Sequence, residues 1–108
     1  MANILIKSNT ETSDFKIDFR KRVLYWSKKT HAVPTRIRFQ KMSKKWASCS
    51  TAGQITFNLS LLDKPRHFQD AVIVHELLHL LVPNHGKLFK SMFSSFLPKG
   101  EEILNKGI

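Results

Sequence analysis

The segment from Ala71 to Val82 constrains the fold of this chain more than any other feature. It reads AVIVHELLHLLV and is apolar except at His75, Glu76 and His79. A helix over this run would bury most of its circumference. It would also hold the polar groups in a low-dielectric setting, where burial is costly unless they have partners. We therefore expect a central buried helix with a functional reason for its polar residues.

The spacing of the polar residues indicates a metal site. His75 and His79 are four residues apart, so a helix places both on nearly the same face. Glu76 lies about 100° around the helix, where it can reach a metal-bound water as a general base. His85 follows a Pro-Asn pair that should end the helix and turn the chain back. Three imidazoles would leave a position open for water, and nitrogen ligands suit Zn²⁺.

Two other readings of the motif stay open at this level. One is a satisfied pair of helix histidines beside a surface glutamate. The other is a structural zinc site, but such sites usually have four protein ligands, often cysteines. The chain has one cysteine, Cys49. An enzymatic site therefore fits the residues better than a structural one.

Further elements recur in order around this motif: Lys45-Trp46-Ala47-Ser48-Cys49, then Gly53 and the strand-like residues 55–59, then Val74 to Leu80, then Asn84-His85 and Phe89. The set resembles the YgjP-like metallopeptidase domain family, which carries Arg-Trp-Gly-Ser-Cys, Val-His-Glu-Leu-x-His and Asn-His-Ser-x-x-Phe-Trp in this order. The resemblance spans about residues 35–97. It implies a zincin-type fold with His75, His79 and His85 as metal ligands and Glu76 as base.

The chain departs from that family pattern at four positions. Lys45 and Ala47 replace Arg and the first Gly, Gly86 replaces Ser, and Lys90 stands where Trp is usual. These changes leave the metal residues intact but should alter the walls of the substrate cleft. Metzincins share the histidine spacing but have Gly where this chain has Val82, so that kinship is weaker.

Length and composition indicate one small domain over residues 1–108 with a shallow groove. The hydrophobic content of 42% is ordinary for a globular protein. The longest apolar stretch is too short to cross a membrane, and the first residues lack a secretory h-region. A single cysteine is compatible with a reducing compartment. We therefore expect a cytoplasmic protein without a membrane segment.

The hydrophobic periodicity predicts an α+β fold in the order β-α-β-β-α-α, with a two- or three-stranded sheet packed on the metal helix. Helix 14–30 should begin at Ser13 as N-cap and bury Phe15, Phe19, Val23 and Trp26. The strands near residues 37–40 and 55–59 should pair in antiparallel fashion. The expected elements are a strand at 3–7, a helix at 14–30, strands near 37–40 and 55–59, the metal helix at 65–82, and a helix from 87 with another turn at 101–105.

Charge is concentrated in the first half of the chain. Residues 1–50 contain 12 Lys and Arg against 3 acids, net +9, whereas residues 51–108 contain 6 against 5, net +1. The excess offers a patch for nucleic acid phosphates or an acidic protein partner. A basic nucleic-acid-associated module with a structural or vestigial zinc site is therefore the alternative function. The patch would comprise Arg20, Lys21, Arg22, Lys28, Lys29, Arg36, Arg38, Lys41, Lys44 and Lys45.

The function that the residues favour is a zinc-dependent metallopeptidase that acts on a peptide or protein substrate, with Glu76 as general base. The sheet edge beside the cleft should bind the substrate as an extended strand. Trp46 either borders the cleft or packs a loop against the core, and Cys49 reads as a small buried residue. His31 and His67 read as surface residues. Candidates for stabilising the oxyanion are Tyr25, His31, Arg36 and Arg38.

Overall fold

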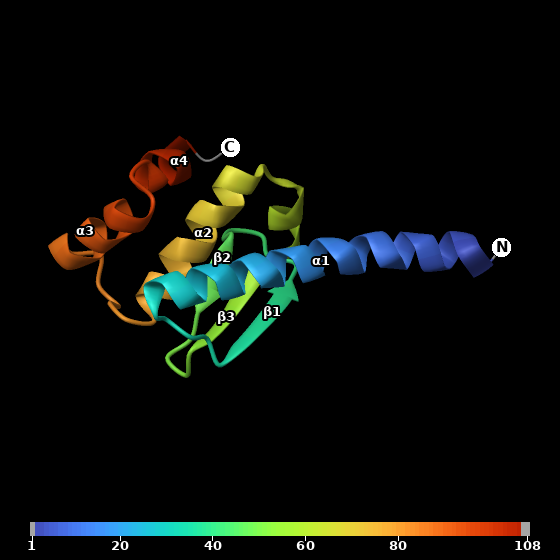
Figure 1. The fold of residues 1–108 in the computed structure, drawn as a ribbon, viewed down its shortest axis with the longest axis horizontal. Coiled ribbons are helices and arrows are strands. Elements are labelled where there is room, and N and C mark those ends of the chain that lie inside the picture. Colours follow the sequence, from blue (N-terminus) through green and yellow to red (C-terminus); the bar gives the residue numbers. More distant parts are fainter. Residues whose placement is uncertain (1, 107–108) are drawn as a thin grey trace.

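The computed structural model describes the backbone of residues 2–106 and the side chains of residues 14–106. Its helices and mixed sheet form the expected α+β, zincin-like fold (Figure 1). In chain order the elements are α1 (Ala2–Thr30), β1 (Arg36–Gln40), β2 (Ala47–Cys49), β3 (Gln54–Asn58), a 3₁₀ turn η1 (Leu59–Asp63), α2 (Arg66–His79), α3 (Lys87–Phe96) and α4 (Gly100–Lys106).

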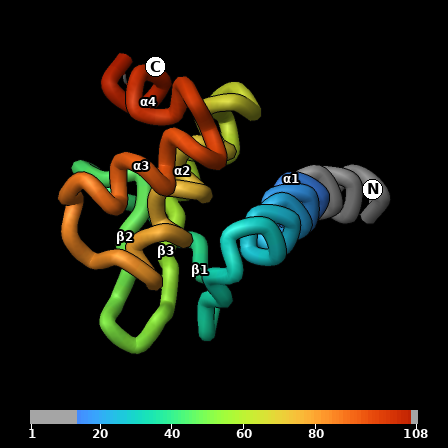
Figure 2. The backbone as a smooth tube through the Cα atoms, turned by 60° about the vertical axis from the view of Figure 1, so that its left-hand side comes forward, coloured from blue at the N-terminus to red at the C-terminus, as the bar shows by residue number. Residues whose placement is uncertain are grey.

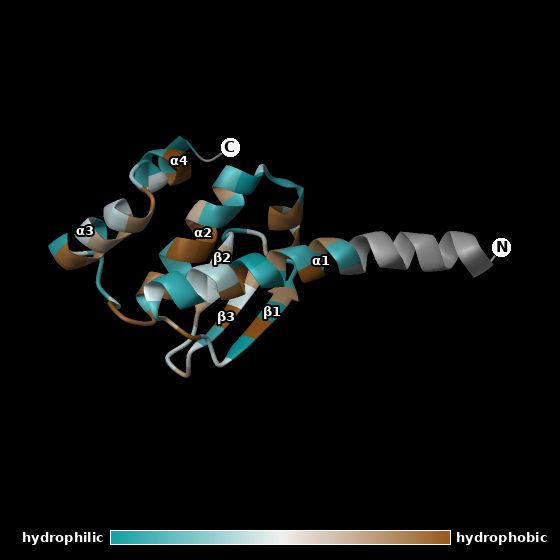
Figure 3. Ribbon diagram, in the orientation of Figure 1, coloured by the Kyte–Doolittle hydropathy of each residue, from teal (hydrophilic) through white to brown (hydrophobic). Residues whose placement is uncertain are grey.

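Helix α2 is the centre of the fold, as its apolar sequence predicts. It lies between α1 and the sheet on one side and α3 with α4 on the other (Figures 1 and 2). Phe68 and Leu77 belong to a core shared with α1 and β3, whereas Val74 and Leu78 belong to a second core with α3. Each such buried side chain contributes about 1.5–3 kcal/mol. Figure 3 accordingly shows the middle of α2 in brown and its first turn in teal.

The sheet has the strand order β1-β3-β2. Strand β2 is antiparallel to β3, and the turn between them has Gly53 at φ +85°, a conformation that favours glycine. Strand β1 is parallel to β3, with Ile37 opposite Ile55 and Phe39 opposite Phe57. The predicted antiparallel pairing of these two strands is therefore wrong, because the short strand β2 reverses the chain between them.

Helix α1 differs from the prediction at its start. It begins at Ala2, so residues 3–7 are helical and Ser13 is inside the helix rather than its N-cap. A short apolar run fits a strand and a helix equally well, which explains the error. The described part of α1 buries Phe19 and Val23 completely, but Phe15 is 59% exposed. The buried stripe therefore begins one turn later than expected.

Helix α2 is shorter than predicted at its C-terminal end. It spans Arg66–His79 with Pro65 as its N-cap. The helix then ends in a tighter turn, in which Leu80 N and Leu81 N donate to the carbonyls of Leu77 and Leu78 (both 3.0 Å). Among the described residues, no helix combines the length and apolar character that a membrane span requires.

Candidate metal centre

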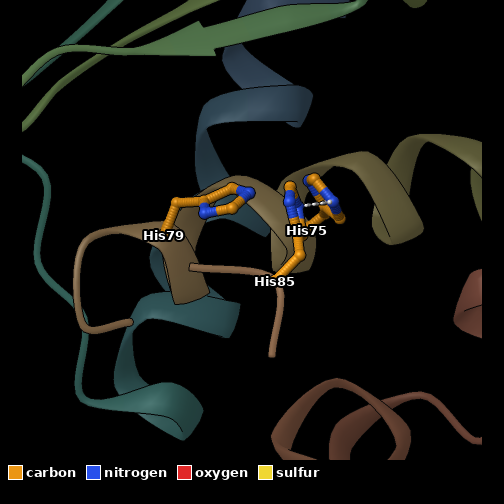
Figure 4. A group of neighbouring side chains, drawn as sticks. All are labelled: His75, His79 and His85. Atoms are coloured by element: carbon orange, nitrogen blue, oxygen red, sulfur yellow. Dashed lines mark hydrogen bonds between the residues drawn. The ribbon is translucent and has the colours of Figure 1, made fainter. Parts of the chain in front are cut away.

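The three predicted histidines come together at the C-terminal end of α2. Their candidate ligand atoms all lie within 4.8 Å of one another. The ring centroids of His75 and His79 are 4.7 Å apart, as expected for residues one helical turn apart. His85 comes from the loop before α3, and its ring points toward the other two (Figure 4). The turn after α2 thus brings His85 back to the other two histidines, as the Pro-Asn pair predicted.

The closest contact in the cluster joins the Nε2 atoms of His75 and His85 at 3.1 Å (Figure 4). Two unprotonated imidazole nitrogens repel at that distance, so they need a proton or a shared cation between them. Zinc–nitrogen bonds of about 2.1 Å allow two ligands to lie at most about 4.2 Å apart. Three imidazole nitrogens within 4.8 Å of one another are a donor set that could hold such an ion.

Phe89 supports all three imidazoles from α3. Its ring stacks on that of His79 with a centroid distance of 4.6 Å. It meets the rings of His75 and His85 edge-on, at 5.2 and 4.8 Å. Phe89 is completely buried, so its ring restricts the rotamers of the three histidines on the side that faces α3. From the sequence alone, Phe89 was recognised only as a position of the family pattern.

Glu76 is the buried carboxylate of the site, with 9% of its surface exposed. Its Oε2 atom lies 3.2 Å from Nδ1 of His75. When Nδ1 carries the proton, it donates to this carboxylate and leaves Nε2 of His75 free as a ligand. Glu76 is therefore beside the histidine cluster without being part of the donor set.

The pKa of His79 is lowered, first by burial and then by the positive charge that His75 can carry. Glu76 acts in the opposite direction but does not reverse the shift. A lowered pKa favours the neutral imidazole, which is the form that binds metal ions. The surroundings of His79 thus favour its neutral form.

The cluster opens into a cleft of about 730 Å³. Strand β2 forms one wall with Ser48 and Cys49, and the turn at residues 50–53 continues it. His75, Glu76 and His79 form the opposite side. The sheet places β2 at its edge, with β3 on one side only. An open edge strand thus runs along the cleft that contains the histidines.

Trp46 packs against the core, as one of its two predicted roles requires, and it does not line the cleft of the histidines. It packs edge-on against Phe68, with ring centroids 5.3 Å apart. It also lines a second, smaller cavity of about 280 Å³ together with His75 and Glu76. Cys49 is half-buried and faces the cleft, so the expectation of a simply buried residue is incomplete.

The proposed oxyanion candidates do not line the cleft of the described structure. Tyr25 is 52% exposed on α1 and packs against Trp26. Arg36 and Arg38 are exposed on β1, and β3 separates that strand from β2. His31 is exposed after α1, and His67 is exposed at the start of α2, as predicted.

The predicted basic patch is divided by its own contacts. Arg22 forms an ion pair with Asp70 at 2.9 Å, and Arg20 donates to the carbonyl of Ile37 at 3.2 Å. Lys45, in contrast, lines the cleft beside His75. Arg20 and Arg22 therefore make contacts within the fold, and Lys45 is a cleft residue that the charge pattern alone did not distinguish.

Comparison with solved structures identifies the fold. The structure resembles the crystal structure of the metallopeptidase zymogen of Pyrococcus abyssi abylysin, with a TM-score of 0.73 and 18% sequence identity. The match covers 82% of this chain and 90% of that chain. At this identity the likeness concerns the fold, which is that of a zincin-like metallopeptidase.

The family follows from the sequence itself. The model of the YgjP-like metallopeptidase domain matches residues 7–106, and the chain belongs to this family. A search of curated proteins found no match. The resemblance over residues 35–97 is thus confirmed and extends over nearly the whole chain. Family and fold together indicate a metallopeptidase, which is a metal-dependent hydrolase of peptides.

Proposed function

We propose that this single-domain chain is a zinc peptidase in which His75, His79 and His85 hold the ion. The observation that carries the proposal is the convergence of three imidazoles within 4.8 Å beside a buried carboxylate. Three nitrogen ligands with an open fourth position are typical of catalytic zinc, whereas structural zinc is usually closed by four protein ligands. When bound, zinc lowers the pKa of a coordinated water toward neutrality and polarises a carbonyl.

Glu76 acts as the general base and acid. Its carboxylate accepts a proton from the attacking water and later donates it to the leaving amine nitrogen. Burial strengthens this role because few waters compete for the carboxylate. The contact with Nδ1 of His75 holds the carboxylate at the edge of the cluster.

The edge strand β2 would bind the substrate. A peptide added beside β2 would form backbone hydrogen bonds along the strand and pass over His75 and Glu76. Recognition would then depend on the peptide backbone and on a few side-chain pockets next to the site.

Substitution of Glu76 by Gln tests this mechanism. The variant should bind zinc as wild type does, because Gln keeps the shape of the side chain and the histidines are unchanged. It should lose about 10²–10⁴-fold in hydrolysis of a peptide library, because the amide cannot take up the proton. His79→Ala should instead lose the metal.

Metal content measured by elemental analysis and cleavage measured by mass spectrometry separate the two variants. Wild-type activity in Glu76→Gln would contradict the assigned base. Unchanged zinc content in His79→Ala would contradict the assigned ligands.

A further inference from the structure

The loop between β1 and β2 is strongly basic. We call residues 41–45 the basic loop; its sequence is KMSKK, and Lys41, Lys44 and Lys45 are all exposed. The loop lies close to the histidines, because Lys45 lines the cleft that contains them.

The basic loop borders the catalytic cleft. Lys45 lines the cleft and also the cavity of about 280 Å³, both of which have His75 and Glu76 in their walls. Lys41 and Lys44 line an adjoining cavity of about 370 Å³, which shares Lys45 and Ser48 with the cleft. The lysines therefore lie along one side of the cleft, with Lys45 in the same walls as the proposed base and Lys41 and Lys44 in the adjoining cavity.

Asn58 fixes the backbone of the loop. Its side chain is buried, and Nδ2 donates to the carbonyls of Met42 (2.9 Å) and Lys45 (2.8 Å). The backbone N–H of Asn58 also donates to the carbonyl of Trp46 (2.8 Å), whose ring packs on Phe68. These contacts hold the loop in place before a substrate binds, which lowers the entropic cost of using it.

The charge of the loop is not balanced by nearby acids. Within the described structure, no carboxylate forms an ion pair with Lys41, Lys44 or Lys45. Among the described residues, Glu76 is the one carboxylate in the walls of the cleft and of the cavity of about 280 Å³, and no carboxylate lines the cavity of about 370 Å³. An anionic group that enters beside Lys45 would therefore be attracted by the positive potential of the loop, and it could pair with the Lys45 ammonium group.

We propose that the basic loop makes this peptidase selective for substrates with Glu or Asp next to the scissile bond. The acidic side chain would place its carboxylate against the ammonium group of Lys45. Lys41 and Lys44 would attract further acidic residues along the same side. This inference rests on the proposed function, because it takes a peptide as the molecule that enters the cleft.

The first test is cleavage of a proteome-derived peptide library by zinc-loaded protein, with Glu76→Gln as the blank. We expect Glu and Asp to be enriched at a fixed position beside the cleavage site. A peptide from that set and its Glu→Gln counterpart then give kcat/KM values that differ by about tenfold, as for one charge-assisted hydrogen bond.

Variants of Lys45 assign the preference to this side chain. Lys45→Met should bring the two peptides to equal kcat/KM, and Lys45→Glu should favour a counterpart peptide with Lys at that position. Asn58 holds Lys45 through its backbone carbonyl, so neither substitution removes that hydrogen bond. Lys21→Met removes one exposed charge from α1, away from the cleft, and should leave the preference unchanged.

Several results would overturn the inference. Cleavage without acidic enrichment would do so, as would a preference that survives in Lys45→Met. Equal losses on both peptides would assign Lys45 to the reaction itself rather than to selection.

A binding measurement separates this inference from the proposed function. Zinc-loaded Glu76→Gln should bind a fluorescein-labelled Glu-containing peptide about tenfold more tightly than its Gln counterpart, by fluorescence anisotropy. If wild type cleaves nothing, the proposed function fails, and this difference still decides whether the loop selects acidic peptides. Equal affinities would reject the selectivity whatever the activity.

Discussion

The environment of Cys49 gives a residue-level check on the position of the proposed base. Burial raises the pKa of this thiol, and the negative charge of Glu76 raises it further. In metal-depleted protein, the pH midpoint for alkylation of Cys49 by iodoacetamide should lie above that of the unfolded chain. Glu76→Gln should lower the midpoint, because the carboxylate no longer opposes the thiolate.

Glu101→Gln is the matched control for this experiment. It removes an exposed carboxylate from α4, outside the walls of the cleft, and should not change the alkylation profile. Identical profiles for wild type and Glu76→Gln would show that the carboxylate does not face Cys49. The placement of the base beside β2 would then be wrong.

Sequence could predict the site residues that depend on local geometry. The helical period alone relates His75, His79 and Glu76, so their grouping was predictable. The return of His85 followed from the turn that Pro and Asn promote. The roles of Lys45 and Phe89 depend on tertiary contacts, namely the hydrogen bond to Asn58 and the packing under the imidazoles. No local pattern encodes those contacts.

At the level of elements, the junction of α3 and α4 depends on Gly100. A Cβ atom at this position would lie 2.7 Å from Cζ of the buried Phe93. Alanine would gain about 1 kcal/mol in helix propensity, but overpacking of a core ring costs typically 1–3 kcal/mol. Gly100→Ala should therefore lower the free energy of unfolding, as measured by urea denaturation.

Gly86→Ala provides the comparison, because a Cβ atom there has no neighbour within 4 Å. Gly86 is the N-cap of α3 and has a negative φ of −83°. Its replacement should cost about 0.5–1 kcal/mol, because alanine is a poorer N-cap than glycine, and should involve no steric clash. A Gly100→Ala variant as stable as wild type would contradict the tight packing of α4 on Phe93.

Elements that are long or have a clear hydrophobic periodicity could be predicted from the sequence, whereas a very short strand could not. The apolar run of α2 and the alternation in β1 and β3 located these elements within a few residues. The parallel pairing of β1 and β3 was not predictable, because it depends on β2, which has three residues and no clear alternation. The N-terminal part of α1 was missed because residues 3–7 fit either period.

For the whole molecule, metal binding should appear as a gain in stability. A ligand that binds only the folded state at 100 times its Kd contributes about 2.7 kcal/mol. For a domain of this size, that corresponds to a rise in Tm of about 10–20 °C. Calorimetry should show this rise on addition of zinc to wild type but not to His79→Ala. A similar rise in both proteins would place the bound metal elsewhere.

The net charge of +10 is also a property of the whole chain, and the sequence located its excess in residues 1–50. Composition could not tell which cations are engaged internally. Arg22 pairs with Asp70, whereas Lys45 lines the cleft. The difference arises from packing between α1 and α2 and from the course of the loop before β2.

The most direct test of the account is the metal content of purified wild type and His85→Ala, measured in parallel by elemental analysis. His85 is the proposed ligand that the turn after α2 brings to the other two histidines. We expect about one zinc per chain in wild type and a markedly lower content in the variant. Wild type that takes up no metal after zinc addition, or equal content in both proteins, would contradict the three-histidine site.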